Sequence, residues 1–356
     1  MLQGKLKMQT KSYPFVSVIV ICWNNTKFLE DCFSSITAQT YRNFEAILVD
    51  NASLDDSVEF IIKNYPFVRI IQNKKNLGFA EGNNVAMRLV LKENKSKYIL
   101  ILNPDTTLEP EFFENMVNAA ERNSTIGAFA PKMLVMNRKD RISSAGGDCV
   151  FRCGDNLSRM FYFDDNESHK EEFVFGPSGA AALYRVDMLR EIGLYEKFLF
   201  TYYEDVDLNF RIQKSGRGAM YVPDAVMYHY HSGSLNEFNP YKVYLLNRNK
   251  YLVILKNYPI KLMLRYWKDL GGSFVAFAKH CYGNHLKSSW MRIILFVLAR
   301  IPVILVKRIA LLKITKSGSE NIIAQFIEEH EQLMSTERRQ NSFDEYMQDL
   351  KDRELN

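Results

Sequence analysis

The chain of 356 residues is 47% apolar and 24% charged, a balance that excludes a disordered or fibrous protein and predicts a globular one. Its net charge of +5 does not by itself indicate a nucleic-acid-binding protein, and we expect none as a partner. Five scattered cysteines exclude a disulfide framework, and the closest pair, Cys149 and Cys153, lacks the two-residue spacer of redox and zinc motifs.

This cysteine usage is typical of a reducing compartment. The residues before Tyr13 include lysines but no apolar stretch of the kind found in a secretory signal. We therefore expect a cytoplasmic protein.

Short apolar runs alternate with helical patterns over the first hundred residues. The runs are typical of parallel strands buried on both faces, and they lie at Val16–Ile21, Ala46–Val49, Val68–Ile71 and Tyr98–Leu102. Helical spacing occupies the segments between them, at Lys27–Gln39, Ser57–Asn64 and Gly82–Glu93. This alternation predicts a doubly wound α/β domain with a mostly parallel central sheet.

Polar residues follow every one of these predicted strands. They include Asn24 after the first strand, Asp50 and Asn51 after the second, the segment Asn73–Gly78 after the third, and Asn103 and Asp105 after the fourth. One polar strand end is ordinary helix-capping chemistry. Four at the same sheet edge predict a binding site, because ligands of open α/β sheets bind beyond the carboxyl ends of the strands.

Two of these strand ends indicate phosphate chemistry. Asp105 follows Pro104, whose fixed φ can hold the carboxylate toward a divalent cation. The glycine-rich loop Asn76–Asn84 suits close backbone approach to a phosphate or a ribose. No lysine follows Gly82 and no GxGxxG follows the first strand, which disfavours kinases and dehydrogenases.

Acids and histidines cluster further along the chain. Glu204, Asp205 and Asp207 stand at the start of a predicted helix, where they either cap the helix or supply a general base. His229 and His231 share one face of an extended segment, where they are either structural residues or metal ligands.

Six ordered motifs between residues 14 and 235 resemble a known family. They are VSVIVICWNN, VDNASLDDS, NKKNLGFAEGNN, ILNPDTTLEP, the segment from GPSGAAALYR to NFRIQKSG, and VPDAVMYHYHSGS. Together they resemble the inverting family 2 glycosyltransferases of the GT-A fold, and among these the bacterial rhamnosyltransferase-like enzymes. The resemblance implies a GT-A catalytic domain over residues 14–240, preceded by an extension over residues 1–13.

The resemblance also implies residue roles. Asp205 would be the catalytic base, and Asp105 and His229 would bind a divalent cation, Mg²⁺ or Mn²⁺, with His231 as a further candidate. The donor would be bound by Cys22, Asn24, Asp50, Asn51, Gly78, Asn83, Asn103 and Glu204. Asn103 replaces the first acid of the D-x-D motif, which removes one charge near the metal. Cys22 and Trp23 replace a smaller polar residue and a tyrosine, which alters the expected base pocket.

A basic segment, residues 241–316, follows this domain and holds 15 Lys and Arg residues and one acid, Asp269. Within it the apolar stretch Met291–Leu312 is interrupted by four cations and by Pro302, so it predicts an amphipathic helix in the plane of an anionic membrane surface rather than a span. A core helix is the alternative. The acidic segment, residues 317–356, predicts a helix that folds back or assembles a homo-oligomer, or else a solvated tail.

The combined expectation is a metal-dependent inverting glycosyltransferase at the cytoplasmic face of the membrane. It would move a sugar from a nucleotide-diphosphate donor to a hydroxyl of a glycan or polyprenyl-linked acceptor in cell-surface polysaccharide synthesis. Donors such as dTDP-rhamnose, UDP-sugars and GDP-sugars stay open. A sugar-phosphate nucleotidyltransferase would need a basic loop where Asn24 and Asn25 stand, and an inactive scaffold would lack Asp105 or Asp205.

Overall fold

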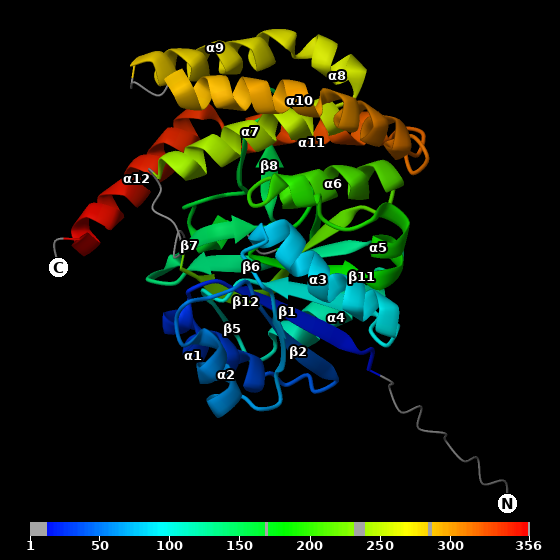
Figure 1. The fold of residues 1–356 in the computed structure, drawn as a ribbon, viewed down its shortest axis with the longest axis vertical. Helices are drawn as coiled ribbons and strands as arrows, with labels where there is room; N and C mark the ends of the chain where they lie inside the picture. Colours follow the sequence, from blue (N-terminus) through cyan, green and yellow to red (C-terminus); the bar gives the residue numbers. More distant parts are fainter. Residues whose placement is uncertain (1–12, 168–169, 231–238, 284–286, 355–356) are drawn as a thin grey trace, which may run out of the picture.

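A ten-stranded sheet forms the centre of this computed structural model, which describes residues 13–167, 170–230, 239–283 and 287–354 (Figure 1). The strand order is β10-β12-β6-β11-β4-β1-β2-β3, with β5 paired to β12 and β7 paired to β6. The expected α/β fold with a mostly parallel central sheet is confirmed. His231 and most of the expected N-terminal extension lie outside the described residues.

The first half of the sheet is parallel, as the apolar runs predict. β1 (Val16–Cys22) lies between β2 (Phe44–Asp50) and β4 (Tyr98–Leu102), and β3 (Arg69–Gln72) pairs with β2. The connecting helices are α1 (Thr26–Thr37), α2 (Ser57–Asn64) and α3 (Gly78–Glu93). α3 begins at Gly78 instead of Gly82, so most of the expected glycine-rich loop is helical. The Asn76 side chain accepts a hydrogen bond from Gly78 N and supports this early start.

The second half of the domain adds strands of three to eleven residues that pair mostly antiparallel, with β12 and β6 as a parallel pair. Its elements are β5 (Thr106–Leu108), α4 (Phe112–Arg122), β6 (Ala128–Val135), β7 (Arg138–Ala145), β8 (Asp148–Val150), β9 (Asn156–Ser158), β10 (Glu172–Val174), β11 (Ala181–Arg185), α5 (Val186–Ile192), α6 (Glu204–Ser215) and β12 (Ala219–His229). β8 and β9 form a separate hairpin. The antiparallel pairing of β5 with β12 sets His229 opposite Thr106, beside Asp105.

Two hydrophobic clusters cover the two faces of the sheet. Val18 and Val20 of β1 belong to the cluster that includes α1, α2 and α4. Ile19 and Ile21 belong to the opposite cluster, which includes α3, α5 and α6. This two-residue alternation on a fully buried strand explains why the sequence of β1 is continuously apolar.

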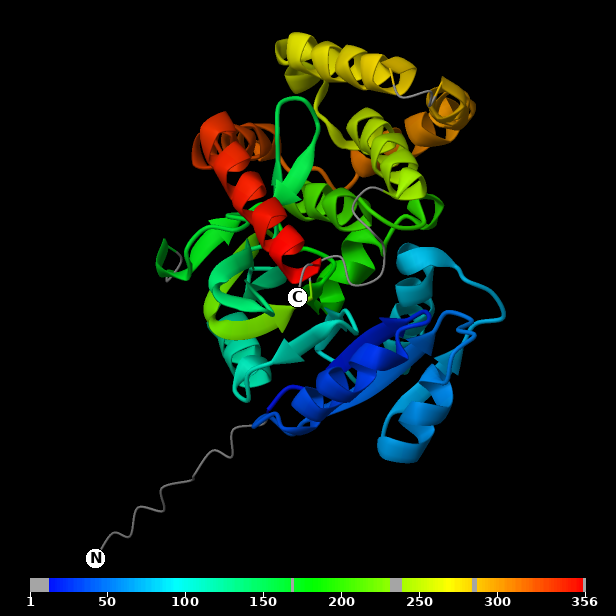
Figure 2. The ribbon, with the colours of Figure 1, turned by 90° about the vertical axis from the view of Figure 1, so that its left-hand side faces the viewer.

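The remaining chain forms a layer of helices beyond α6: α7 (Pro240–Asn257), α8 (Ile260–Arg265), α9 (Trp267–Gly283), α10 (Lys287–Leu311), α11 (Ser319–Leu333) and α12 (Thr336–Glu354). Figure 2 shows the yellow and orange α8–α10 at the opposite end of the molecule from the blue N-terminal elements. None of the helices within the described ranges combines the length and apolar character needed to cross a membrane.

The helical layer is held to the sheet domain by a buried charge network on α6. Asp207, which is fully buried, accepts hydrogen bonds from Lys256 Nζ at 2.7 Å and from Asn257 Nδ2 at 2.7 Å, and pairs with Arg211 at 3.0 Å. Burial pushes the pKa of Asp207 upward, but Lys256 and Arg211 outweigh it and hold this pKa at about 2. α7 is therefore bonded to the same helix that begins at Glu204 and Asp205.

We predict that Lys256→Met destabilises the protein by about 3 kcal/mol at pH 7, because Asp207 then stays buried with less compensation. Since the folded-state pKa of Asp207 is depressed, its stabilising contribution is present above the unfolded value and is lost as the pH falls toward 2. Chemical denaturation of both proteins at several pH values measures this difference, which should shrink below about pH 4.

The matched control is Lys279→Met, which changes an exposed lysine of α9. It should leave the free energy of unfolding within about 0.5 kcal/mol of the wild type. Equal effects of the two substitutions would contradict the role assigned to the Asp207 network.

Candidate active site

Two adjoining cavities open beyond the carboxyl ends of the parallel strands. The first has a volume of about 450 Å³ and is lined by strand-end residues together with α3 and the segments before α6 and at the start of α7. Its lining residues are Ile21, Cys22, Trp23, Asn25, Asn51, Asn76, Gly78, Phe79, Asn103, Pro104, Asp105, Phe200, Thr201, Tyr202, His229, Tyr241 and Lys242. Aromatic rings thus surround a floor of short polar side chains.

The second cavity, of about 250 Å³, lies beside the first and shares Phe79, Asn103, Thr201, Tyr202 and His229 with it. Its other walls come from β7, the β8–β9 hairpin, the segment Ser178–Ala180 and the start of α6. Asp148, Glu204 and Asp205 all line this second cavity. The two cavities therefore meet along the His229 and Asn103 side of the site.

Asn51 organises the strand-end side of the first cavity. Its Nδ2 donates to Asn76 Oδ1 at 2.9 Å and to Gly78 O at 3.1 Å, and its Oδ1 accepts from Leu77 N at 3.0 Å. The side chain is 3% exposed, so most of its hydrogen-bonding capacity is used within the protein. Asn51 therefore fixes the start of α3 against the end of β2.

Gly78 marks a close approach between α3 and the segment before α6. Its φ is +77°, and a Cβ there would lie 2.4 Å from Phe200 O. The Ala80 N–H donates to the same Phe200 carbonyl at 3.0 Å. Only glycine satisfies both the left-handed backbone and this contact. Gly78, which was predicted to bind the sugar donor, thus lines the cavity and also lets α3 contact the segment before α6.

The segment Phe200–Tyr203 carries unusual backbone strain just before α6. Phe200, Tyr202 and Tyr203 all have φ values near +69°. Asn249 of α7, which is fully buried, donates through Nδ2 to the carbonyls of Leu199, Thr201 and Tyr202 at 2.8, 2.9 and 2.7 Å. A strained segment persists when its surroundings fix it, and such segments cluster at functional sites.

Asp105 and His229 face each other at the edge shared by the two cavities. His229 Nε2 lies 3.5 Å from Asp105 Oδ1. That carboxylate oxygen is buried and makes no hydrogen bond among the described residues. An orphaned carboxylate oxygen beside an imidazole nitrogen suits a divalent cation. Within the described ranges, however, no group of three His, Cys, Asp or Glu side chains converges as a complete metal site.

Asp205 stands at the first turn of α6 and faces the second cavity. Its Oδ2 accepts from Gly179 N at 2.7 Å, and its Oδ1 accepts from Val206 N at 2.8 Å. Burial raises the pKa of Asp205 above its ordinary value, while these two amides act in the opposite direction. Burial, together with Asp205, also raises the pKa of Glu204. A carboxylate with a raised pKa at a cavity wall can act as a general base.

The structure brings most of the predicted site residues together, but not all. Cys22, Asn51, Gly78, Asn103, Asp105 and His229 line the first cavity, and Glu204 and Asp205 line the second. Asn83 is fully buried in α3 and its Nδ2 donates to Phe79 O, so it faces the protein interior. Asn24 and Asp50 accept hydrogen bonds from Leu54 N and Ser53 N, and both stabilise the loop after β2.

Sequence reasoning missed several residues of this site. Asp148 gave no signal, because a single acid in a glycine-containing segment belongs to no recognisable pattern. Asn249 and Lys242 lie in the basic segment, which was interpreted through its net charge. Tyr241, at the start of α7, lines the first cavity beside Lys242. Only the packing of α7 against α6 and the segment before it brings these α7 residues to the site.

The chain is similar in sequence and in fold to known proteins. Residues 17–193 match the family described as "Glycosyl transferase family 2". The N-acetylglucosaminyl-diphospho-decaprenol L-rhamnosyltransferase of Mycobacterium tuberculosis is 25% identical over 234 residues, which cover 61% of this chain and 76% of the relative. The low-salt glycan biosynthesis hexosyltransferase Agl10 of Haloferax volcanii is 23% identical over 252 residues, covering 69% and 77%.

A similar fold occurs in the crystal structure of GalNAc-T7 with UDP, GalNAc and Mn²⁺. The TM-score is 0.57 at 14% sequence identity, and the match covers 70% of this chain. This chain spans about half the length of that structure, 49%. The likeness supports the α/β architecture of the central sheet.

Proposed function

The chain is a glycosyltransferase of family 2 with a GT-A fold, and we propose that its two cavities hold the donor and the acceptor of an inverting transfer. The observation that carries this proposal is the placement of Asp205. Its carboxylate lines the second cavity next to the boundary with the first, and the hydrogen bond from Gly179 fixes it there. A base in that position can activate an acceptor hydroxyl that faces a sugar bound across the boundary.

The first cavity suits a nucleotide-diphosphate sugar. Trp23, Tyr202 and Tyr241 offer flat apolar surfaces for a base, while Lys242 provides a cation for the diphosphate. The amide of Asn51 is already engaged by protein groups, so we assign it a positioning role. Asn24, Asp50 and Asn83, which the family resemblance implied as donor contacts, support the loop after β2 and the interior of α3.

A divalent cation fits beside the diphosphate. We propose that Asp105 and His229 hold it, since the unpaired Asp105 Oδ1 is directed toward His229 Nε2 at 3.5 Å. When bound, the cation would neutralise charge on the leaving diphosphate. The neutral Asn103 leaves only two protein ligands in the described residues, so donor and water oxygens would complete the coordination.

In the transfer itself, the Asp205 carboxylate takes the proton of the acceptor hydroxyl. The oxygen attacks the anomeric carbon as the bond from that carbon to the diphosphate oxygen breaks, and the nucleoside diphosphate leaves with both bonding electrons. One in-line displacement inverts the anomeric configuration. The walls shared by the two cavities, including Phe79 and Tyr202, exclude water from the reacting atoms.

For the sugar and its acceptor, we propose L-rhamnose, carried on a dTDP donor, and a glycan linked through diphosphate to a polyprenyl lipid. This proposal depends on the activity for which the mycobacterial relative is named, and that relative is 25% identical. A panel of dTDP-, UDP- and GDP-sugars tested for donor hydrolysis and for binding would identify the donor. Preferential binding of a UDP- or GDP-sugar would contradict dTDP-rhamnose as the donor.

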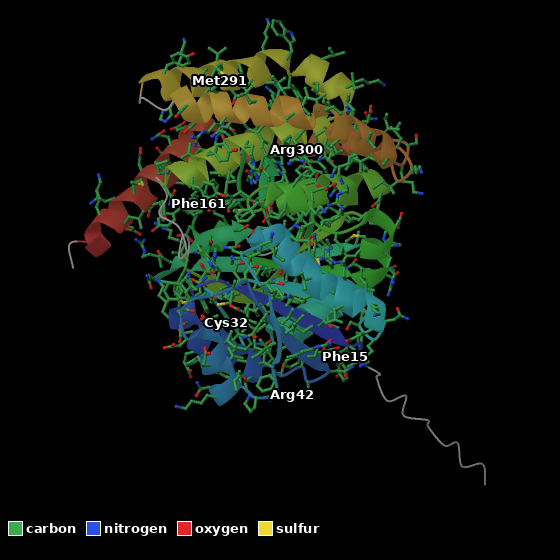
Figure 3. All side chains as sticks on the ribbon, viewed as in Figure 1. Phe15, Cys32, Arg42, Phe161, Met291 and Arg300 are labelled. Carbon is green, nitrogen blue, oxygen red and sulfur yellow. The ribbon has the colours of Figure 1, made fainter. Side chains whose placement is uncertain are left out.

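The outer helices suit a lipid surface, and we propose that they hold the enzyme at the cytoplasmic face of an anionic membrane. Figure 3 labels Met291 and Arg300 on this outer layer. Large exposed apolar side chains lie along α8, α9 and α10 and include Leu264, Trp267, Leu295, Leu305, Val306 and Ile309. Arg265, Lys268, Arg292 and Arg300 are exposed among them. Apolar and cationic side chains on one surface are typical of interfacial helices.

The electrostatic part of this attraction is smaller than the composition suggests. Among the described residues of this segment, several cations bond to other protein groups: Arg248, Lys250, Lys256, Lys307 and Arg308, with Arg265 at 3.5 Å from Glu328. Each remaining cation at an anionic surface contributes about 1 kcal/mol. Apolar insertion by α10 must therefore supply a substantial share of the binding.

We predict that Asp205→Asn lowers turnover by roughly two to four orders of magnitude and leaves donor affinity unchanged, since the amide keeps the shape but cannot take a proton. Donor binding by calorimetry and initial transfer rates measure the two effects separately. Glu204→Gln is the control for the neighbouring acid. Wild-type turnover in Asp205→Asn with loss in Glu204→Gln would assign the base to Glu204.

We predict that EDTA abolishes transfer and that Mg²⁺ or Mn²⁺ restores it, because Asp105 and His229 offer oxygen and nitrogen ligands. Asp105→Asn should weaken Mn²⁺ binding measured by paramagnetic resonance in the presence of the nucleoside diphosphate. Full activity in chelator would show that protein cations such as Lys242 neutralise the diphosphate instead.

We predict that the full chain sediments with anionic liposomes, and that binding weakens but persists at high salt because apolar contacts remain. Ile309→Glu, at a side chain that is 65% exposed, should release the protein to the supernatant. Leu54→Glu, at a 95% exposed side chain in the loop before α2, is the matched control and should bind as the wild type does. Equal behaviour of both variants would exclude α10 as the membrane contact.

A further inference from the structure

A third carboxyl group in the second cavity has no part in the mechanism above. Asp148, the first residue of β8, is 5% exposed and lines the cavity together with Asp205 and Glu204. Its carboxyl group lines the same small cavity as that of Asp205, and the two groups interact closely enough for Asp205 to raise the pKa of Asp148. The other oxygen, Oδ2, is buried and has no hydrogen-bond partner among the described residues.

The backbone around Asp148 is fixed by contacts that leave it little freedom. Gly147 has a φ of +96°, and a Cβ there would lie 2.0 Å from Gly176 O. Asp148 N donates to that same carbonyl at 3.2 Å. Two residues further along β8, Val150 N donates to His330 Nδ1 of α11 at 2.9 Å. The hairpin is therefore held from both sides, and Asp148 cannot withdraw from Asp205.

The charges around this pair do not favour two ionised carboxylates. The described residues that line the second cavity include Asp148, Glu204, Asp205 and His229 but no lysine or arginine. Tyr202 and Tyr203 also line this cavity, and the buried hydroxyls of Tyr184 and Tyr195 lie near the carboxyl groups. Three adjacent carboxylates without a compensating cation would repel each other strongly in a partly dry site. At least one of them must hold a proton.

We propose that Asp148 is the proton-holding member of this group and is a positioning residue for the base Asp205. In this proposal its carboxylic acid donates a hydrogen bond to the Asp205 carboxylate, whose Oδ2 and Oδ1 also accept from Gly179 N and Val206 N. The remaining lone pairs of Asp205 are then directed into the cavity toward the acceptor hydroxyl. Asp148 keeps its own proton throughout, and the acceptor proton goes to Asp205. This inference depends on the proposed role of Asp205.

The direction of the pKa shifts agrees with this assignment. Burial, followed by the charge of Asp205, raises the pKa of Asp148 well above its ordinary value. The same hydrogen bond acts in opposite directions on the two groups, raising the pKa of Asp148 and lowering that of Asp205. A neutral donor facing an ionised acceptor produces this pattern.

The test uses the full chain and three substitutions. Asp148→Asn keeps a hydrogen-bond donor without a titratable proton, Asp148→Ala removes the donor, and Asp155→Asn changes an acid of the same hairpin that is ion-paired with Lys250 at 2.8 Å. Infrared difference spectra at pH 7 report neutral carboxylic acids. We expect Asp148→Asn to lose one neutral-carboxyl band and Asp155→Asn to lose none. That band should shift in Asp205→Asn, because its acceptor has become an amide.

Kinetics supply the second readout. Asp148→Ala should lower kcat roughly tenfold to a hundredfold with an unchanged KM for the donor, since a hydrogen bond to a charged group is lost. Asp148→Asn should restore kcat to within several-fold of the wild type. The folded protein retains the Asp148 proton, whereas an unfolded chain releases it above about pH 4, so a neutral Asp148 lowers the free energy of unfolding as the pH rises. An acid that stabilises the fold in its ionised form would have the opposite effect. Asp148→Asn removes this cost and should be at least as stable as the wild type at pH 8.

The outcomes separate this inference from the proposed function. An unchanged neutral-carboxyl spectrum in Asp148→Asn means that Asp148 is ionised, and overturns the inference whatever Asp205 does. Equal kcat in Asp148→Ala and the wild type also overturns it. Wild-type turnover in Asp205→Asn would instead overturn the assignment of the base, even if the spectrum shows a neutral Asp148.

Discussion

The buried carboxylate of Asp207 is the constraint on which the rest of the site depends. It is fully buried, and Lys256, Asn257 and Arg211 compensate its charge from two helices. Because Asp207 lies two residues after Asp205, the same ion pairs that attach α7 to the domain also fix the N-terminus of α6. The helical layer therefore supports the proposed active site, and removing it would leave the buried Asp207 with only Arg211 of the partners named here.

The two sides of the site reach one another through backbone contacts. Gly78 admits the Phe200 carbonyl, and Asn249 holds the left-handed segment that follows it. α11 fixes the hairpin that carries Asp148 through His330, whose burial lowers its pKa to about 4 and keeps it neutral. The acidic C-terminal segment thus folds back onto the domain, which is one of the alternatives that the sequence predicted beside a solvated tail. The β8–β9 hairpin and the start of α6, which both line the second cavity, are therefore held by helices from the C-terminal third of the chain.

The sequence predicted the parallel strands and their polar ends well, because continuous apolar runs such as Val16–Ile21 occur for few other reasons. It predicted the start of α6 from its acids. The sequence did not predict that α3 begins at Gly78, because glycine disfavours helix. Only the close contacts of Gly78 with Phe200 and of Gly82 with Ile21 explain why glycine stands at these two positions. The sequence did not indicate Asp148 or Asn249 as site residues, because their roles depend on partners far away in the chain. The composition of the basic segment overstates the positive charge on its surface, because Lys256 and Arg248 are buried.

The anomeric configuration of the product tests the central claim most directly. In the proposed mechanism one base, Asp205, lies across a cavity boundary from the donor, and the transfer is a single displacement. Proton NMR of the first-formed product, with the donor that the nucleotide-sugar panel identifies, should therefore show an anomeric centre inverted relative to that donor. A product that retains the donor configuration would contradict the account, because retention requires either a second displacement or attack from the leaving-group side.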